Sequence, residues 1–295
     1  MVKLLLLFTL IFSFSFAQEL ENDEDLLLKK IKTFVSPSVF KKDRAYLEII
    51  FSPKEEYYLE DNVVDSVKVI KTLKENGILN LFFKAPKELN ISFKTTGNSL
   101  FFVKIMSDTL RNIGYYRYVT KESNLDNKEF TWKISLTSEY AADPVVLSKE
   151  LKKNSCKILD IIRTSPTDWT YVIDMQNAKL NTRILYNGEE VRLKRSLYAY
   201  WLDVSQIKKL KITSSYRNSW YPYIAYYDES LKLLRVIKRD KKRKNITLNM
   251  KENTYYLKIS DIYTLKNIKD SLVLTPMGQR EVKEDESKME VEEVY

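Results

Sequence analysis

The periodicity of the apolar residues changes near residue 178, and this change limits the possible folds more than any other feature. Before it, apolar residues recur at helical spacing and then alternate along strands. After it, the helical period is absent and short alternating runs follow one another. We therefore expect an α+β protein with repeated helix–strand–strand modules over 45–176. An all-β sandwich domain of jelly-roll character is expected over 179–276.

The α+β region contains a pattern that occurs three times: an amphipathic helix, a short break, a strand, a turn and a second strand. The three copies run Val63–Thr95, Asn98–Ser138 and Asp143–Met175. The last strands of the second and third copies, Phe130–Leu136 and Trp169–Met175, share one order of aromatic, Thr, aromatic, any residue, Ile, polar and apolar. One copy cannot cover its own apolar faces, so we expect the helices to pack on a common sheet.

Within the first copy, the strands are expected to form a tight pair. Ile78–Phe83 and Leu89–Phe93 predict two strands, and Ala85-Pro86-Lys87 predicts the turn between them. A further strand is expected in front of this copy, at Tyr46–Phe51. The order of elements then contains β-α-β-β-α-β, which is the ferredoxin-like arrangement.

The stretch from Leu89 to Ile162 resembles the SPOR domains of bacterial cell-envelope proteins. The resemblance lies in the order of elements and in Leu110–Tyr115, which leads into the expected hairpin. The chain departs from that family in having Thr137–Tyr140 where a Gly-Pro-Tyr or Gly-Pro-Phe segment is usual. SPOR domains are ferredoxin-like modules that bind peptidoglycan glycan strands, so the resemblance implies peptidoglycan as a ligand.

The C-terminal part begins with a strong hairpin signal. Asn187-Gly188 stands between two predicted strands, Thr182–Tyr186 and Glu190–Lys194. Further strands are expected at Tyr198–Val204, Lys208–Thr213, Tyr223–Tyr227, Leu231–Lys238, Asn245–Met250, Tyr255–Ser260 and Ser271–Thr275. The runs Ile246–Asn249 and Asn253–Ile259 resemble the closing strands of the pre-peptidase C-terminal class of secreted β-sandwich. That resemblance implies an accessory module that binds or spaces and does not catalyse.

The ends of the chain predict where the protein works. Lys3, the apolar run Leu4–Phe16 and the small residue Ala17 have the layout of a secretory signal peptide over 1–17. The run is too short for a bilayer, which takes about 20 residues, and no second apolar stretch follows, so no transmembrane anchor is expected. Residues 18–44 are expected to be a leader or linker, and 277–295 an acidic disordered tail. We expect export to the periplasm.

Composition excludes several kinds of chemistry. The chain has no histidine and a single cysteine, Cys156. Nucleophilic mechanisms that use a histidine base are therefore excluded, and so are the common zinc sites. Only five glycines are present, and neither dinucleotide nor P-loop fingerprints occur. We expect no cofactor, no metal and no enzymatic activity, with Cys156 a buried thiol.

Aromatic residues of the sandwich are the first candidate site. Exposed rings can serve as flat platforms for sugar faces, whereas the alternative is that these rings fill the sandwich core or cover its edge. Trp132 and Trp169 are expected in the core of the α+β region, because they lie on apolar strand faces. The glycan-binding candidates are Tyr200, Trp201, Trp220, Tyr221 and Tyr223.

A basic cluster is the second candidate. It lies between two predicted strands, so it is expected to form a hairpin loop. The plain interpretation is a solvated loop, and the functional one is electrostatic contact with a wall polymer, a membrane surface or an acidic partner. The net charge of +9 suits such partners, while export argues against nucleic acid. The cluster consists of Arg239, Lys241, Lys242, Arg243 and Lys244.

These features together predict a non-catalytic periplasmic protein that acts as a scaffold or adaptor for an envelope protein. The Lys-, Ile- and Asn-rich, Gly-poor usage suits an AT-rich bacterial genome. The chain is similar to uncharacterised periplasmic proteins of Campylobacter-type bacteria, and this resemblance implies a role in the periplasmic structures of the flagellar motor. The alternative is a module that binds peptidoglycan or another glycan. A second alternative is a hydrolase that uses paired carboxylates. The carboxylates in or near predicted strands are Asp43, Asp160, Asp174, Asp203 and Asp228.

Overall fold

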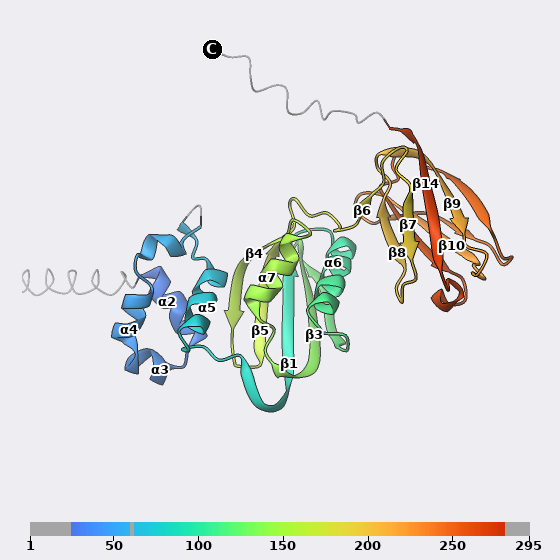
Figure 1. Ribbon diagram of the computed structural model, residues 1–295. Helices are drawn as coiled ribbons and strands as arrows, with labels where there is room; N and C mark the ends of the chain where they lie inside the picture. Colours follow the sequence, from blue (N-terminus) through green and yellow to red (C-terminus); the bar gives the residue numbers. More distant parts are fainter. Residues whose placement is uncertain (1–24, 60–61, 281–295) are drawn as a thin grey trace, which may run out of the picture. The chain divides into compact units, whose positions relative to one another are not determined.

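A computed structural model describes residues 25–59 and 62–280 (Figure 1). The chain separates into two compact units, one up to Lys179 and one from Leu180. The expected signal peptide over 1–17 lies outside the described residues. The expected acidic tail over 277–295 also lies outside them from residue 281 onward, whereas residues 277–279 belong to the last strand of the second unit.

Within the described residues, the first unit begins with three short helices, a 3-10 turn and a fourth helix, and its sheet follows along the chain. Asp25 begins α2, because its side chain accepts a 2.9 Å hydrogen bond from the backbone N of Leu27. Ser36 and Pro37 begin α3 in the same way. The segments are α2 (Leu26–Phe34), α3 (Pro37–Lys42), α4 (Arg44–Ile50), η1 (Lys54–Tyr57) and α5 (Ser66–Glu75).

Two predictions for this region are wrong. The segment 18–44, expected to be a leader or linker, contains α2, which buries Leu27 and Phe34, and α3, which buries Phe40. The segment Tyr46–Phe51, expected to be a strand, lies mainly in α4. Leu47 and Phe51 are four residues apart and both are buried, so the helical spacing places them on one inward face.

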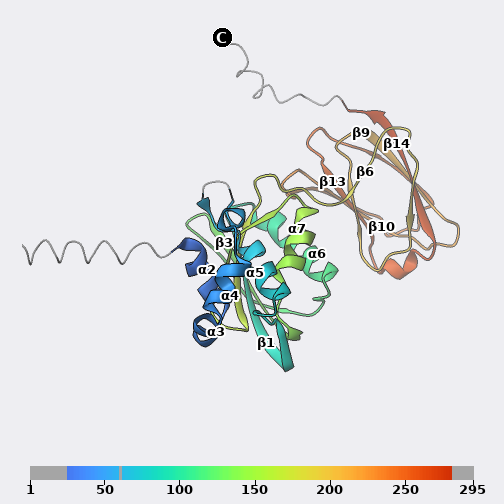
Figure 2. The same ribbon diagram turned by 60° about the vertical axis from the view of Figure 1, so that its left-hand side comes forward.

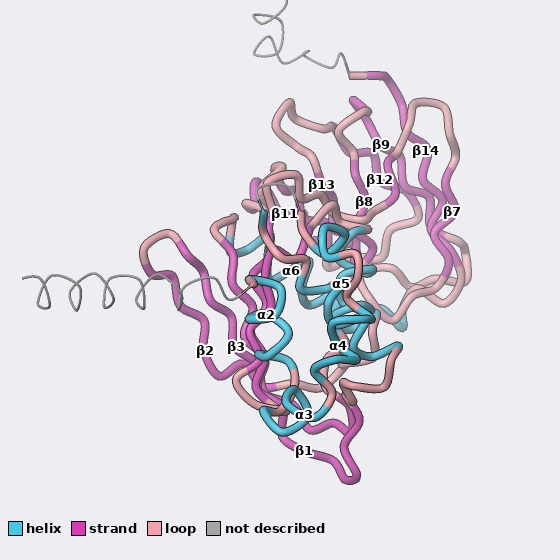
Figure 3. Tube along the Cα trace, turned by 90° about the vertical axis from the view of Figure 1, so that its left-hand side faces the viewer, coloured by secondary structure: helices cyan, strands magenta, loops and turns pink. Residues whose placement is uncertain are grey.

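The sheet of the first unit has five strands in the order β2-β3-β1-β5-β4, with β1 antiparallel to β3 and parallel to β5. Helices α6 and α7 lie over one face of this sheet (Figures 1 and 2), and Figure 3 shows β2 and β3 side by side. The elements are β1 (Phe82–Thr95), α6 (Ser99–Asn112), β2 (Val119–Asp126), β3 (Glu129–Tyr140), α7 (Pro144–Lys152), β4 (Lys157–Arg163) and β5 (Asp168–Asp174).

The predicted fold class of repeated helix–strand–strand modules is wrong. The described chain is mostly β, with 39% strand and 25% helix, and it contains three sheets and few helices. The two strands expected in the first copy are one strand, β1, and Ala85–Lys87 does not form the turn of a hairpin. Phe82 pairs with Tyr140 and Lys87 with Ser138, so both flanks pair with β3 and the residues between them bulge out.

Apolar side chains alternate along the central strands and build the core of this unit. Leu89, Ile91 and Phe93 on β1 are fully buried, while the residues between them are half-buried and polar. Trp132 on β3 and Trp169 on β5 are buried, as the sequence predicts. The sheet is therefore covered by helices on its apolar face.

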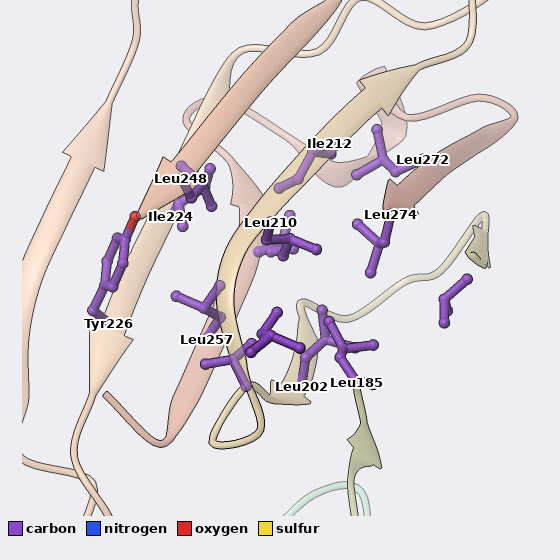
Figure 4. Close-up of a cluster of buried hydrophobic side chains, with 14 of the residues drawn as sticks. Leu185, Leu202, Leu210, Ile212, Ile224, Tyr226, Leu248, Leu257, Leu272 and Leu274 are labelled. Carbon is purple, nitrogen blue, oxygen red and sulfur yellow. The ribbon is translucent and has the colours of Figure 1, made fainter. Parts of the chain in front are cut away.

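The second unit is a sandwich of two sheets, with strand orders β11-β10-β13-β8-β6 and β12-β9-β14-β7. Inward-facing aliphatic residues of both sheets meet in one core, shown in Figure 4. The elements are β6 (Arg183–Ile184), β7 (Val191–Lys194), β8 (Tyr200–Asp203), β9 (Ile207–Ser214), β10 (Pro222–Tyr227), β11 (Leu233–Lys238), β12 (Asn245–Asn249), β13 (Tyr256–Asp261), η3 (Leu265–Asn267) and β14 (Ser271–Gln279).

The Asn187-Gly188 turn does not join a hairpin, contrary to the sequence prediction. β6 pairs with β8 in one sheet, whereas β7 pairs with β14 in the other, so the turn crosses between sheets. The side-chain oxygen of Asn187 accepts a 2.8 Å hydrogen bond from the backbone N of Gly278. Gly188 has a φ of +80°, which explains why glycine occupies this position.

Over 25–59 and 62–280, no helix combines the length and the apolar character that a membrane crossing needs. Within the same ranges, no group of three or more His, Cys, Asp or Glu residues could hold a metal ion.

Candidate functional site

Aromatic and cationic side chains alternate on the outer surface of the sheet that contains β8, β10 and β13. Ile224 and Tyr226 of β10 point into the core, so Tyr223, Ala225 and Tyr227 point outward. Ala225 is nevertheless fully buried, because larger outward-facing neighbours cover it. We call the outward-facing set the aromatic face, and it consists of Trp201, Tyr223, Tyr227, Lys238 and Lys258.

Strand register brings the members of the aromatic face together. Lys258 on β13 lies opposite Trp201 on β8 and opposite Ala225 on β10. Trp201 and Tyr227 lean toward each other across β13, with ring centroids 5.0 Å apart and planes 35° from parallel. The two strands that flank β13 therefore supply a pair of rings that contact each other, and β13 supplies a lysine on the same face.

Cations lie over two of these rings. The Nζ of Lys258 lies 5.6 Å from the centre of the Trp201 ring, and the Nζ of Lys238 lies 5.4 Å from that of Tyr223. Each ammonium is attracted by the electron-rich face of its ring. Burial raises the pKa of Tyr227, and the nearby Tyr223 raises it further, so the Tyr227 ring is neutral at neutral pH. The aromatic face thus offers flat apolar surface and positive charge together.

Three of the predicted glycan-binding residues lie elsewhere. Trp220 is fully buried and its Nε1 donates a 2.8 Å hydrogen bond to the backbone oxygen of Ser260, so the prediction that it forms an exposed platform is wrong. Tyr200 packs against the core, and its hydroxyl donates to the backbone oxygen of Lys194 at 2.7 Å. Tyr221 packs edge-on against another ring near the end of the sheet.

From the predicted set, Trp201 and Tyr223 lie on the same outer face of the sheet. Sequence reasoning missed Tyr227, Lys238 and Lys258. Tyr227 could have been found, since it lies four residues after Tyr223 on the same side of an alternating strand. The two lysines could not, because their place on the aromatic face depends on which strands pair.

The basic cluster Arg239–Lys244 connects β11 of one sheet to β12 of the other, so the prediction of a hairpin loop is wrong. Its side chains are exposed, as either interpretation of the cluster requires. Its backbone is held in place, because the N of Arg243 donates to the oxygen of Trp220 at 3.0 Å. The loop therefore presents its cations from a fixed backbone.

The aspartates considered for hydrolysis lie on separate elements. Asp160 on β4 forms an ion pair with Lys30 at 2.5 Å and accepts a hydrogen bond from Ser66 at 2.8 Å. Asp174 and Asp228 accept hydrogen bonds from backbone N atoms that follow them in turns. Asp203, at the end of β8, accepts a hydrogen bond from the backbone N of Ser205, and Asp43 precedes α4.

A shallow groove of about 410 Å³ lies on the first unit, beside the start of β1 and the end of β3. Two exposed rings line it, Phe82 and Tyr140, with centroids 5.1 Å apart. The hydroxyl of Tyr115 donates to the backbone oxygen of Tyr140 at 3.4 Å, and burial raises the pKa of Tyr115. This groove combines apolar rings with a polar margin.

No family model matches the chain, and no curated protein matches it, so neither supports the resemblance to SPOR domains or to periplasmic proteins of Campylobacter-type bacteria. The chain is similar to the solved structure of the pre-peptidase C-terminal domain of a collagenase from Bacillus anthracis. The two are 14% identical, the match covers 32% of this chain and 93% of that domain, and the TM-score is 0.23.

Proposed function

We propose that the protein is a non-catalytic adaptor of the cell envelope whose aromatic face binds an anionic glycan. The observation that supports this most directly is the Trp201–Tyr227 pair with the Lys258 ammonium over the indole ring. The C–H faces of sugar rings pack on flat aromatic surface through dispersion and burial of apolar area. Lysines beside the rings attract the carboxylates of an acidic polymer such as peptidoglycan.

Retention on purified peptidoglycan sacculi tests this function. We expect the full chain to sediment with sacculi, and Trp201→Ala and Tyr227→Ala each to reduce the retained fraction several-fold. Lys258→Ala should weaken retention most at low salt, because added salt screens the charge of the wild-type lysine. Tyr216→Ala is the matched control, since Tyr216 is an aromatic residue 79% exposed and outside the aromatic face. Wild-type retention by Trp201→Ala would refute the glycan-binding role.

The envelope location is part of the same proposal and rests on the N-terminal residues. Lys3, the apolar run and Ala17 favour export and cleavage before Gln18. N-terminal sequencing of protein recovered from the periplasmic fraction should therefore begin at Gln18. Recovery of the intact N-terminus from the cytosol would contradict the location and leave the sacculus experiment unaffected.

A second candidate function is a scaffold for a protein partner, and the groove beside Phe82 and Tyr140 favours it. Phe82 is 45% and Tyr140 57% exposed, although both are large apolar rings. Apolar groups gathered at the surface often mark contact with a partner. A photo-crosslinking residue placed at Tyr140 in cells should capture one partner reproducibly, while the same residue at Tyr216 should not. Equal labelling from both positions would count against the scaffold.

A further inference from the structure

A small pocket opens at one edge of the sandwich, away from the residues of the aromatic face. It has a volume of about 230 Å³ and lies where β11, the end of β12 and the loop before β13 meet. β11 and β12 are the edge strands of their sheets on that side. A pocket of this size suits a small ligand, such as a single sugar or amino acid.

Two residues that line this pocket, Tyr226 and Thr254, carry buried hydroxyl groups. Tyr226 is 3% and Thr254 is 1% exposed, and Figure 4 shows Tyr226 on β10 at the edge of the core cluster. Among residues 25–59 and 62–280, neither hydroxyl has a hydrogen-bond partner. Buried hydroxyls are normally paired, because a donor removed from water without a partner is destabilising. Two such groups in one pocket point to a polar ligand that satisfies both.

The mouth of the pocket is polar and basic. Arg235 and Lys251 are exposed there, and within the described part of the chain neither side chain forms an ion pair. The Arg235 guanidinium lies 5.9 Å from the centre of the Tyr226 ring. The side-chain amides of Asn249 and Asn253 complete the rim. The charge at the mouth therefore favours an anion.

The loop that carries Lys251 and Thr254 is held rigid from behind. Arg280 donates from Nη2 to the backbone oxygen of Lys251 at 2.6 Å, and from Nη1 to that of Thr254 at 2.9 Å. The backbone N of Thr254 also donates to the oxygen of Lys251 at 3.0 Å. Because these contacts fix the loop, the Thr254 hydroxyl is positioned before any ligand arrives.

We propose that this pocket binds the carboxylate of a small organic acid no larger than one sugar or one amino acid. The two hydroxyls donate to the carboxylate oxygens, while Arg235 and Lys251 neutralise its charge. The Tyr226 ring and Leu234 supply apolar wall for the carbon skeleton. A phosphate dianion fits less well, because the inner donors are neutral and the cost of dehydrating two charges there is larger.

Isothermal titration calorimetry on the full chain tests the proposal with four probes: D-glucuronate, L-glutamate, D-glucose and inorganic phosphate. We expect at least one of the two carboxylates to bind, and glucose and phosphate to bind at least about tenfold more weakly. Tyr226→Phe and Thr254→Val, which remove only the hydroxyls, should each weaken carboxylate binding by about tenfold. Tyr216→Phe, the same change at an exposed tyrosine, should leave it unchanged.

Any other outcome contradicts the proposal that this pocket binds a carboxylate. Binding of no probe means that the pocket holds water only, and equal binding of glucose or tighter binding of phosphate means that the carboxylate is not what is recognised. If Tyr226→Phe and Thr254→Val both bind the carboxylate with unchanged affinity, the two hydroxyls do not contact the ligand. If Tyr226→Phe fails to fold, Thr254→Val alone tests whether a hydroxyl contacts the ligand. Trp201→Ala should keep full affinity for the carboxylate, which separates this result from the sacculus experiment.

Discussion

The indole Nε1 of Trp220 donates a 2.8 Å hydrogen bond to the backbone oxygen of Ser260, and the Trp220 ring is fully buried in the sandwich core. Trp220→Ala removes that bond and leaves a cavity, so we expect the free energy of unfolding of the sandwich to fall by about 3–5 kcal/mol. Urea unfolding followed by far-UV circular dichroism measures the change.

Trp201→Ala is the matched control for this prediction, because Trp201 is half-buried on the outer surface of the same sandwich. We expect it to be clearly less destabilising than Trp220→Ala. Equal losses for the two tryptophans would contradict the placement of Trp220 as the core residue.

The same substitution of tyrosine by phenylalanine should affect stability differently at Tyr226 and at Tyr171. The hydroxyl of Tyr171 donates to the backbone oxygen of Ala142 at 2.6 Å, while that of Tyr226 has no partner among the described residues. In ligand-free protein we expect Tyr226→Phe to be neutral or stabilising and Tyr171→Phe to cost about 1–3 kcal/mol. Urea unfolding of both variants tests the pair, and a large loss from Tyr226→Phe alone would contradict the unpaired hydroxyl.

The stability of the first unit should fall above pH 10, and Tyr171 is a principal cause. Complete burial raises the pKa of Tyr171 well above its ordinary value, and the charges of Tyr115 and Asp143 raise it further. An unfolded tyrosine ionises near pH ~10, so above that pH the unfolded chain binds fewer protons than the folded one. Stability is then full below pH ~10 and is lost as pH rises toward the folded pKa. Unfolding free energies measured from pH 8 to pH 11 should show this decline, and Tyr171→Phe should flatten it.

Local signals in the sequence predict the structure correctly where residues close along the chain determine it. Asp143 followed by Pro144 begins α7, and the alternation of Phe130–Leu136 and Trp169–Met175 places Trp132 and Trp169 in the core. Tyr46–Phe51 was mistaken for a strand because a short apolar run fits both periods. The buried pair Leu47 and Phe51 shows that packing of the helical face decided the outcome.

Local signals in the sequence do not predict which distant strands pair with each other. Asn187-Gly188 forms a turn, but whether it joins one sheet or two depends on β8 and β14, which the turn residues do not specify. The same limit applies to the candidate site. Trp201 and Lys258 are 57 positions apart in the sequence and become neighbours only through the register of β8 and β13. The lysine charge over the indole ring is therefore a property of the fold.

Asp143 should stabilise the first unit in two separable ways. One carboxylate oxygen accepts a 3.0 Å hydrogen bond from the backbone N of Val145, and the other pairs with Lys74. Asp143→Ala removes both contacts and should cost about 1–2 kcal/mol. Asp143→Asn keeps the capping acceptor and loses the charge, so it should cost less than about 1 kcal/mol, as should Lys74→Met. Thermal unfolding of the three variants tests the order, and equal losses for Asn and Ala would refute the capping role.

Cys156 should be chemically inert while the chain is folded. Its side chain is 1% exposed and its Sγ donates to the backbone oxygen of Asn154 at 3.6 Å. Burial, with a smaller contribution from the charge of Asp174, raises the pKa of the thiol to about 12. Only the thiolate is nucleophilic, so at pH 8 a disulfide reagent such as DTNB should react slowly with native protein and rapidly in 6 M guanidinium. Rapid reaction of the native protein, or a disulfide-linked dimer on a non-reducing gel, would show that Cys156 is accessible and would contradict its burial in the loop between α7 and β4.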